Sequence, residues 1–311
     1  MAKPFPFEPL PLGQTCPQSE RGTAQERLSR DLQIVRWFVE KWTGKPIELT
    51  SPLGRLVFHA DSADFSAPTL PLESMPEPER KYWLYAASQI SRLAWAIRAL
   101  HGRSKVEAVH GSFVAHELLA PDTKEKDATY TLAGGVGTLL LAGRLAQAGG
   151  ERICVHGNRR AGHDIRLRTG AGDGILVERK DRAFEAGLDD TMEGRARRVV
   201  QFTGDAGAKI PRESGAVRVL ALGFHDLVRG DDVERVGALY SSALRDGFAD
   251  KTEEQLAELP DYVIVEHFGL EPRTGGEKTD FHAFFPLRRE GSAPRVESLL
   301  DAALGRLPNG P

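Results

Sequence analysis

Apolar residues recur with a helical period in two segments near the N-terminus. In residues 31–45 they lie three or four positions apart, at Leu32, Val35, Phe38, Val39 and Trp42. Gly44 followed by Pro46 predicts the end of this helix. Residues 81–102 carry a wider apolar stripe of the same period, which predicts a longer helix that packs on a core.

Between these helices the pattern changes. Residues 46–50 (PIELT) and 55–60 (RLVFHA) predict a short hairpin, and the proline-rich residues 62–80 predict a linker. The sequence therefore divides into residues 1–80, an extended N-terminal arm with an accessory helix and hairpin, and residues 81–311, an α/β domain.

The second part of the chain alternates helical and strand patterns. Helices are expected at residues 138–149, about 182–200 and 231–249. Strands are expected at 152–157, 164–168, 175–180, 216–224, 261–270 and 281–287. This order predicts an α/β fold with a mixed central β-sheet flanked by helices and an N-terminal helical accessory region.

The strands at 164–168 and 175–180 carry the candidate chemistry. The turn TGAGDG joins them, and if paired residue numbers across this hairpin sum to 342, Asp164 lies opposite Glu178. Successive strand residues point to opposite faces, so Glu178 shares a face with Lys180 while Ile175 and Val177 occupy the other. We therefore expect a chemical face with two carboxylates beside a lysine, and an opposite face that belongs to the core.

Two neighbouring carboxylates repel each other unless a cation lies between them. A hard divalent ion such as Mg²⁺, or Mn²⁺, prefers oxygen ligands, so Asp164 and Glu178 are candidate metal ligands. Such an ion stabilises charge on a phosphodiester, and Lys180 can orient or deprotonate an attacking water. These parts predict hydrolysis of a phosphodiester.

At these residues the chain resembles the PD-(D/E)XK nuclease superfamily, whose motif is an Asp on one hairpin strand and (D/E)-x-K on the next. The resemblance covers roughly residues 133–224 and implies a restriction endonuclease-like core and a Mg²⁺-dependent nuclease, with DNA preferred to RNA. It implies that Asp164, Glu178 and Lys180 are catalytic. Many members carry another acid on the first core helix; Glu117 is the nearest candidate here, and Gln201 corresponds to a glutamine that orients some family sites.

Local charge agrees with an anionic substrate. Residues 152–182 contain eight Lys and Arg against four Asp and Glu, a net charge of +4 in a chain that totals −3. Arg166 and Arg168 share a face with Asp164 and are candidates for phosphate contact. With a pI near 6.3, the protein lacks the broad basic field of many duplex-DNA binders, so a local groove or a partner is needed.

Two other classes of protein remain open. The first is a catalytically inactive interaction or scaffold protein that keeps the nuclease fold, favoured by the missing helix acid. The second is an NADP-binding Rossmann-like protein, because residues 127–160 suggest a strand, a glycine turn at Gly135-x-Gly137, a helix and a strand. Leu140 stands where that motif needs a small residue, and a hairpin follows instead of a helix.

Composition indicates the compartment and the partners. The two cysteines, Cys16 and Cys154, suggest neither a disulfide framework nor a zinc site, so a reducing cytoplasm is expected. The sequence contains no apolar run of the roughly 20 residues that cross a bilayer, and no membrane association is predicted. The proline-stiffened N-terminal arm is typical of a segment that is disordered or lies along a protein partner.

Overall fold

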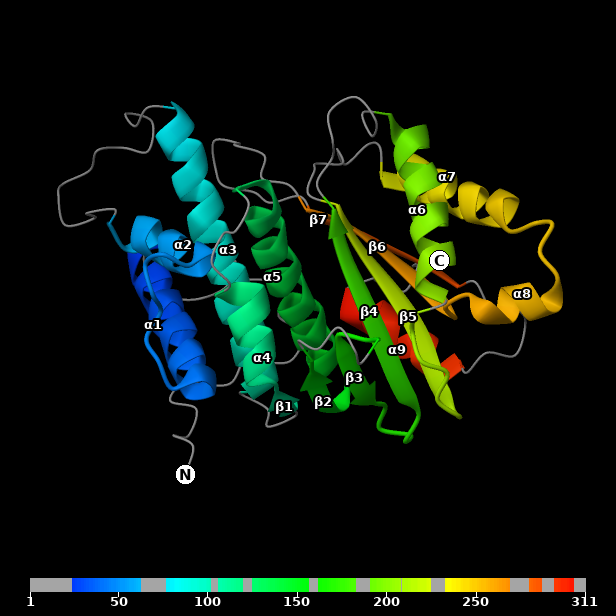
Figure 1. Ribbon diagram of the computed structural model, residues 1–311, viewed down its shortest axis with the longest axis horizontal. Coiled ribbons are helices and arrows are strands. Elements are labelled where there is room, and N and C mark those ends of the chain that lie inside the picture. The colour runs from blue at the N-terminus through cyan, green and yellow to red at the C-terminus, as the bar shows by residue number, and fades with distance from the viewer. Residues whose placement is uncertain are drawn as a thin grey trace, which may run out of the picture. The chain divides into compact units, whose positions relative to one another are not determined.

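The computed structural model describes residues 24–62, 77–101, 106–119, 125–156, 162–182, 191–207, 209–224, 233–268, 280–286 and 294–304. The chain forms two compact units, Met1–Gly157 and Asn158–Pro311 (Figure 1). The N-terminal arm with Cys16, and most of the predicted linker at residues 62–80, lie outside the described residues.

The first unit begins with three helices: α1 (Ala24–Thr43), α2 (Pro52–Ser62) and α3 (Glu77–His101). The predicted apolar face of α1 is buried at Leu32, Val35, Phe38 and Val39 and half-buried at Trp42. The predicted end of the helix is confirmed by Gly44, which has a φ of 69° and donates its amide to Glu40 O at 2.8 Å. The predicted hairpin is wrong, because residues 55–60 lie in α2. Ser51 caps this helix by accepting the Gly54 amide at 2.9 Å, and Pro52 stands at its first position.

The first unit continues as a parallel strand pair with a helical connection. Strand β1 (Val106–Val109) pairs with β2 (Glu151–Val155), and the chain between them forms α4 (Gly111–Phe113), the π-helix η2 (Val114–Leu118) and α5 (Glu125–Gln147). The strand expected at residues 128–132 in the dinucleotide-binding interpretation is wrong, because these residues are helical. Gly135 lies inside α5, where a Cβ would come within 2.8 Å of Glu117 O, so it is a packing glycine and not a phosphate-binding turn.

The second unit contains a mixed sheet. Its described strands lie in the order β3 (Ile165–Arg168), β4 (Gly174–Arg182), β5 (Ala216–Phe224), β6 (Tyr262–Phe268) and β7 (Asp280–Pro286). The pairs β3–β4 and β6–β7 are antiparallel, whereas β4–β5 and β5–β6 are parallel. This arrangement, with helices on both faces, confirms the predicted α/β class with a mixed sheet flanked by helices.

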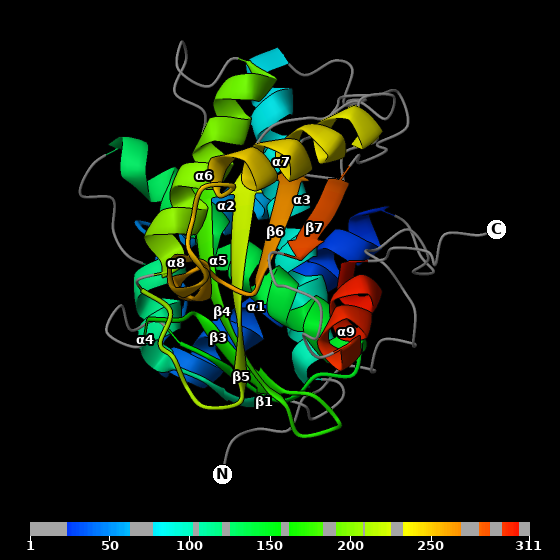
Figure 2. The ribbon, with the colours of Figure 1, turned by 90° about the vertical axis from the view of Figure 1, so that its right-hand side faces the viewer.

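Helices α6 (Met192–Gly207) and α7 (Val233–Gly247) connect the parallel strands and cover one face of this sheet, while α8 (Glu253–Glu258) precedes β6 (Figure 2). Leu176, Leu222 and Val265 of that face share a core cluster with Val199 and Tyr240 of the helices. The other face carries α9 (Pro294–Leu304), whose Glu297 accepts a hydrogen bond of 3.3 Å from the Tyr262 hydroxyl.

The start of α6 differs from the sequence-based prediction. The helix was expected from about Arg182, but β4 continues through Arg182 and α6 begins at Met192. The predicted strand 175–180 is thus longer than expected, and Asp181 lies within it because its carboxylate pairs with the Arg179 guanidinium in the interior. None of the helices in the described parts of the chain is long and apolar enough to cross a membrane.

Candidate functional site

The hairpin of β3 and β4 has the predicted register. Ile165 pairs with Val177 and Arg168 with Gly174, so one further step places Asp164 opposite Glu178. The turn is closed by the Thr169 amide, which donates to Asp173 O at 2.9 Å, and Gly172 adopts the left-handed conformation at φ 94°. The two segments are adjacent antiparallel strands, as predicted.

Asp164 stands at the point where the backbone ladder of the hairpin ends. Its amide donates to Val177 O at 2.8 Å, and its Oδ2 accepts the amide of Arg179 at 2.7 Å. The carboxylate therefore takes the place of a backbone carbonyl in the ladder. A carboxylate offers about four lone-pair directions, so this contact uses only part of its acceptor capacity.

Glu178 is half-buried on the face of β4 that α6 and α7 cover. Burial raises the pKa of its carboxyl above the ordinary value, and the positive charges of Lys180 and then Lys209 act in the opposite direction. Glu178 and Lys180 share this face, as the strand period predicts. The expectation that this face is purely chemical is wrong, because Leu176 lies there and is 1% exposed.

Lys209 was missed by the sequence interpretation. It follows α6, and its backbone carbonyl lies against Gly162, where a Cβ would come within 2.5 Å of Lys209 O and 2.9 Å of Pro211 Cδ. This close approach brings the segment after α6 beside the start of β3, and it requires glycine at 162, whose φ is 69°. No sequence signal points to Lys209, because its proximity to Glu178 arises from tertiary packing.

The remaining candidates are spread over the chain. Arg166 and Arg168 are exposed on β3, as their alternation with Ile165 and Leu167 predicts, and Arg166 forms an ion pair of 3.1 Å with Glu213. Gln201 is exposed on α6, where it accepts a hydrogen bond of 3.3 Å from Arg198. This hydrogen bond lies within α6 and does not join Gln201 to the hairpin carboxylates. Glu117 belongs to η2 in the first unit.

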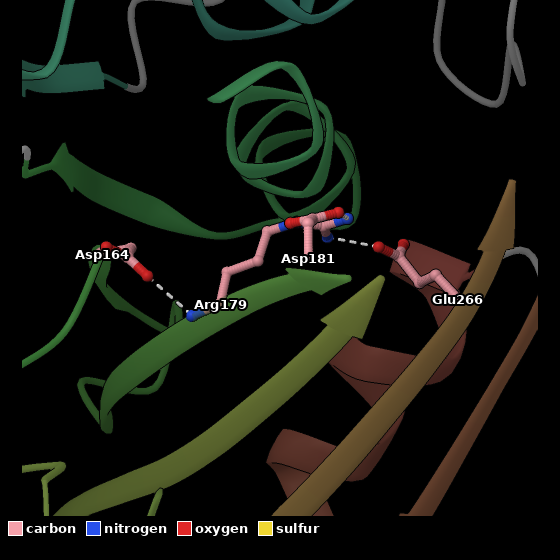
Figure 3. A network of polar contacts seen from close by, with 4 residues as sticks. All are labelled: Asp164, Arg179, Asp181 and Glu266. Carbon is pink, nitrogen blue, oxygen red and sulfur yellow. Dashed lines mark hydrogen bonds and ion pairs between the residues drawn. The ribbon is translucent and has the colours of Figure 1, made fainter. Parts of the chain in front are cut away.

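The opposite face of β4 holds a buried ionic network that the sequence interpretation also missed (Figure 3). The Arg179 Nε and Nη2 donate to the two oxygens of Asp181 at 2.7 and 2.9 Å, and Nη1 donates to Glu266 Oε2 on β6. The expectation of an apolar core on this face holds for Ile175 and Val177 but is wrong for Arg179 and Asp181.

A signal for this network is present in the sequence. Arg179 and Asp181 continue the inward-facing alternation of Ile175 and Val177, and Glu266 directly follows the apolar residues 262–265 of its strand. A charge on a buried face needs an opposite charge beside it, so the three residues can be matched by sign. Sequence alone does not show that β4 and β6 lie close enough for the match.

No protein-family model matches this chain, and no curated protein matches it. Within the residues that the structure describes, no group of three or more His, Cys, Asp and Glu side chains forms a metal-binding cluster. The hairpin pair supplies two carboxylates, which suits an ion such as Mg²⁺ that keeps several of its waters.

Proposed function

We propose that the protein is a metal-dependent phosphodiester hydrolase of the PD-(D/E)XK type that acts on nucleic acid. The observation that supports this proposal most directly is the hairpin register, which sets Asp164 opposite Glu178. Glu178 shares its face of β4 with Lys180. Acid, acid and lysine thus come from two paired strands in the order that the motif requires.

In this proposal Asp164 and Glu178 hold a Mg²⁺ or Mn²⁺ ion, which supplies stabilisation of negative charge on the phosphodiester. As an ammonium group Lys180 has three N–H donors and no lone pair, so in this form it orients the attacking water and does not ligate the metal. To deprotonate the water it has to act as the neutral amine, whose lone pair takes the proton. The partial burial of Glu178 strengthens its interaction with nearby positive groups, because the local dielectric is lower than that of water.

Basic residues around the hairpin support a polyanionic substrate. Arg166 and Arg168 are exposed on β3, and Lys209 lies near Glu178. Guanidinium groups bind phosphate oxygens in pairs, whereas ammonium groups act as point charges. We assign Arg166 and Arg168 to contacts with the phosphate backbone and prefer DNA to RNA as the substrate.

The test is cleavage of single-stranded and duplex DNA and RNA by the purified protein with Mg²⁺, Mn²⁺ or EDTA. Glu178→Ala should abolish metal-dependent cleavage, and Lys180→Ala should lower the rate by about 10²- to 10⁴-fold, the usual contribution of a general acid or base. Glu193→Ala, at an exposed glutamate on α6, is the matched control and should cleave like the wild type. Undiminished cleavage by Glu178→Ala would show that the activity lies elsewhere.

A second candidate function is a non-catalytic interaction protein. It is favoured by the contact of Asp164 with the Arg179 amide, because that contact gives the aspartate a structural role in the hairpin without any metal. The two candidates differ in metal binding in the absence of substrate. A nuclease should gain thermal stability from Mn²⁺ that Glu178→Ala does not gain, since a ligand that binds only the folded state stabilises it.

A further inference from the structure

Arg179 connects the candidate site to the interior of the sheet. Its backbone amide donates to Asp164 Oδ2 at 2.7 Å, and its side chain leaves the strand on the opposite face (Figure 3). There the guanidinium forms a bidentate pair with Asp181 and a further ion pair with Glu266. One residue thus contacts an acid of the site through its main chain and two buried acids through its side chain.

The side chains of this network are almost fully removed from solvent, with 1% exposure for Arg179, 3% for Asp181 and 1% for Glu266. Burial alone would lower the pKa of Arg179, but the charges and hydrogen bonds of Asp181 and Glu266 outweigh it and raise the pKa. The guanidinium therefore stays charged. Buried ion pairs add little stability compared with apolar residues of similar size. The effect of this network that matters here is that it holds the Arg179 side chain in one fixed position.

The sheet is shaped to accommodate the network. Gly223 on β5 pairs with Asp181 on one side and with Glu266 on the other. A Cβ at Gly223 would overlap Asp181 Oδ1 and come within 2.7 Å of Arg179 Nη2. The absence of a side chain on the middle strand lets the guanidinium of β4 reach the carboxylate of β6.

We propose that Arg179 is a positioning residue that holds Asp164, Glu178 and Lys180 in the geometry required for binding a divalent cation. This inference rests on the proposed function of the hairpin. Glu178 and Lys180 are the immediate sequence neighbours of Arg179, and their side chains lie on the other face of β4. Asp164 is joined to Arg179 by the hydrogen bond that its carboxylate accepts from the Arg179 amide. Anchoring the guanidinium to Asp181 and Glu266 fixes the backbone of residue 179, and with it the positions of Glu178 and Lys180 relative to Asp164.

Removing only the arginine would leave two buried carboxylates together and could unfold the protein. The principal variant is therefore the triple substitution R179M/D181N/E266Q, which removes every charge of the network at similar volume. The measurement is the Kd of Mn²⁺ for the full-length folded protein without substrate, by isothermal titration calorimetry. We expect it to rise by about 10- to 100-fold, the usual effect of losing a group that orients a metal ligand.

Arg218→Met is the matched control. Arg218 is also a buried arginine of this sheet, 6% exposed, and its guanidinium donates to the carbonyls of Ala257, Glu258 and Leu259 at 2.7, 3.2 and 2.5 Å. The Arg218→Met variant should lose thermal stability and keep the wild-type Kd for Mn²⁺. If the role of Arg179 were purely structural, the triple variant would likewise lose thermal stability and keep the wild-type Kd.

Kinetics supply a second readout. Because the triple variant keeps Asp164, Glu178 and Lys180, its cleavage rate at saturating Mn²⁺ should stay within a fewfold of the wild type, while the Mn²⁺ concentration for half-maximal rate rises. Arg179→Lys in the wild-type protein should lower the Mn²⁺ affinity less than the triple substitution does, since lysine keeps the charge but not the bidentate fork. A triple variant with wild-type Mn²⁺ affinity overturns the positioning role alone. A wild-type protein that binds no Mn²⁺ overturns the proposed function and this inference with it.

Discussion

Gly223 and Asp181 are paired residues on neighbouring strands, and the backbone of the glycine lies directly against the carboxylate of the aspartate. No other residue type fits at 223 without moving Asp181 or Arg179. The closeness of this contact makes Gly223 a sensitive probe of the buried network, because an added methyl group acts on the network without removing any of its charges.

Gly223→Ala should destabilise the protein by about 1–3 kcal/mol, the usual cost of inserting a methyl group into a packed interior. Its matched control is Gly237→Ala on α7, where a Cβ would meet nothing within 4 Å. That change should stabilise by up to about 1 kcal/mol, because alanine is the better helix former. Urea unfolding followed by circular dichroism measures both; equal stability of the two variants would contradict the contact at Gly223.

Glu178→Gln should raise the melting temperature at neutral pH. The pKa of Glu178 is raised in the folded state, so folding favours its protonated form. The contribution of this glutamate is therefore fully favourable below its unfolded pKa, near 4.5, and is lost as the pH rises through the folded pKa. The difference between variant and wild type should grow from pH 4 towards pH 7.5 in scanning calorimetry.

The control for this pH series is Glu193→Gln, at an exposed position of α6, which should leave the pH profile of stability unchanged. Mn²⁺ at pH 7.5 should then stabilise the wild type and not Glu178→Gln. A melting temperature for Glu178→Gln that lies below the wild type at pH 7.5 and equals it at pH 4 would give the opposite sign and refute the assigned burial effect.

Tyr240→Phe should cost about 1–3 kcal/mol, because it removes the hydroxyl that bonds to His267 Nε2 at 2.8 Å between two side chains with no exposure. The comparison variant is Tyr262→Phe. In the wild type the Tyr262 hydroxyl makes a longer hydrogen bond of 3.3 Å to Glu297 in a partly buried position. This substitution should cost less than Tyr240→Phe. The order is measured by urea unfolding, and a larger loss for Tyr262→Phe would contradict it.

Acid should destabilise the first unit through His101. Burial, and to a smaller extent Lys41, lowers the pKa of this histidine to about 3, and its ring packs against Trp37 and Trp42. Because the folded pKa is lower than the unfolded one, the contribution of His101 is present above pH 6.5 and is lost as the pH falls towards 3. The slope for one such group is at most about 1.4 kcal/mol per pH unit.

Tryptophan fluorescence measures this effect selectively, because Trp37, Trp42, Trp83 and Trp95 all lie in the first unit. Thermal unfolding between pH 7 and pH 4 should show a shallower loss of stability for His101→Phe than for the wild type. His59→Gln, at an exposed position of α2, should keep the wild-type slope. A His101→Phe protein with an unchanged slope would assign the acid sensitivity to other groups.

Most elements with a strong local period were predictable. The helix around Val35 and Phe38 and the strands 216–224 and 261–270 appear where the apolar pattern predicts them, because their burial follows from one face or one continuous run. The segments predicted wrongly had competing signals. Residues 55–60 contain Val57 and Phe58, which favour strands, yet Ser51 and Pro52 begin a helix there. Residues 128–132 contain β-forming threonines but belong to a helix longer than the pattern suggested.

The sequence by itself predicted the hairpin, because the alternation of residues 165–168, the apolar residues 175–177 and the glycine turn between them agree. The register assumed for that hairpin sets Asp164 opposite Glu178, and the structure has this register. Only the tertiary structure decided what surrounds these residues. The approach of Lys209 to Glu178 and the pairing of Arg179 with Glu266 join segments far apart in the chain. Such contacts depend on strand order and helix packing, which a local pattern of polar and apolar residues does not encode.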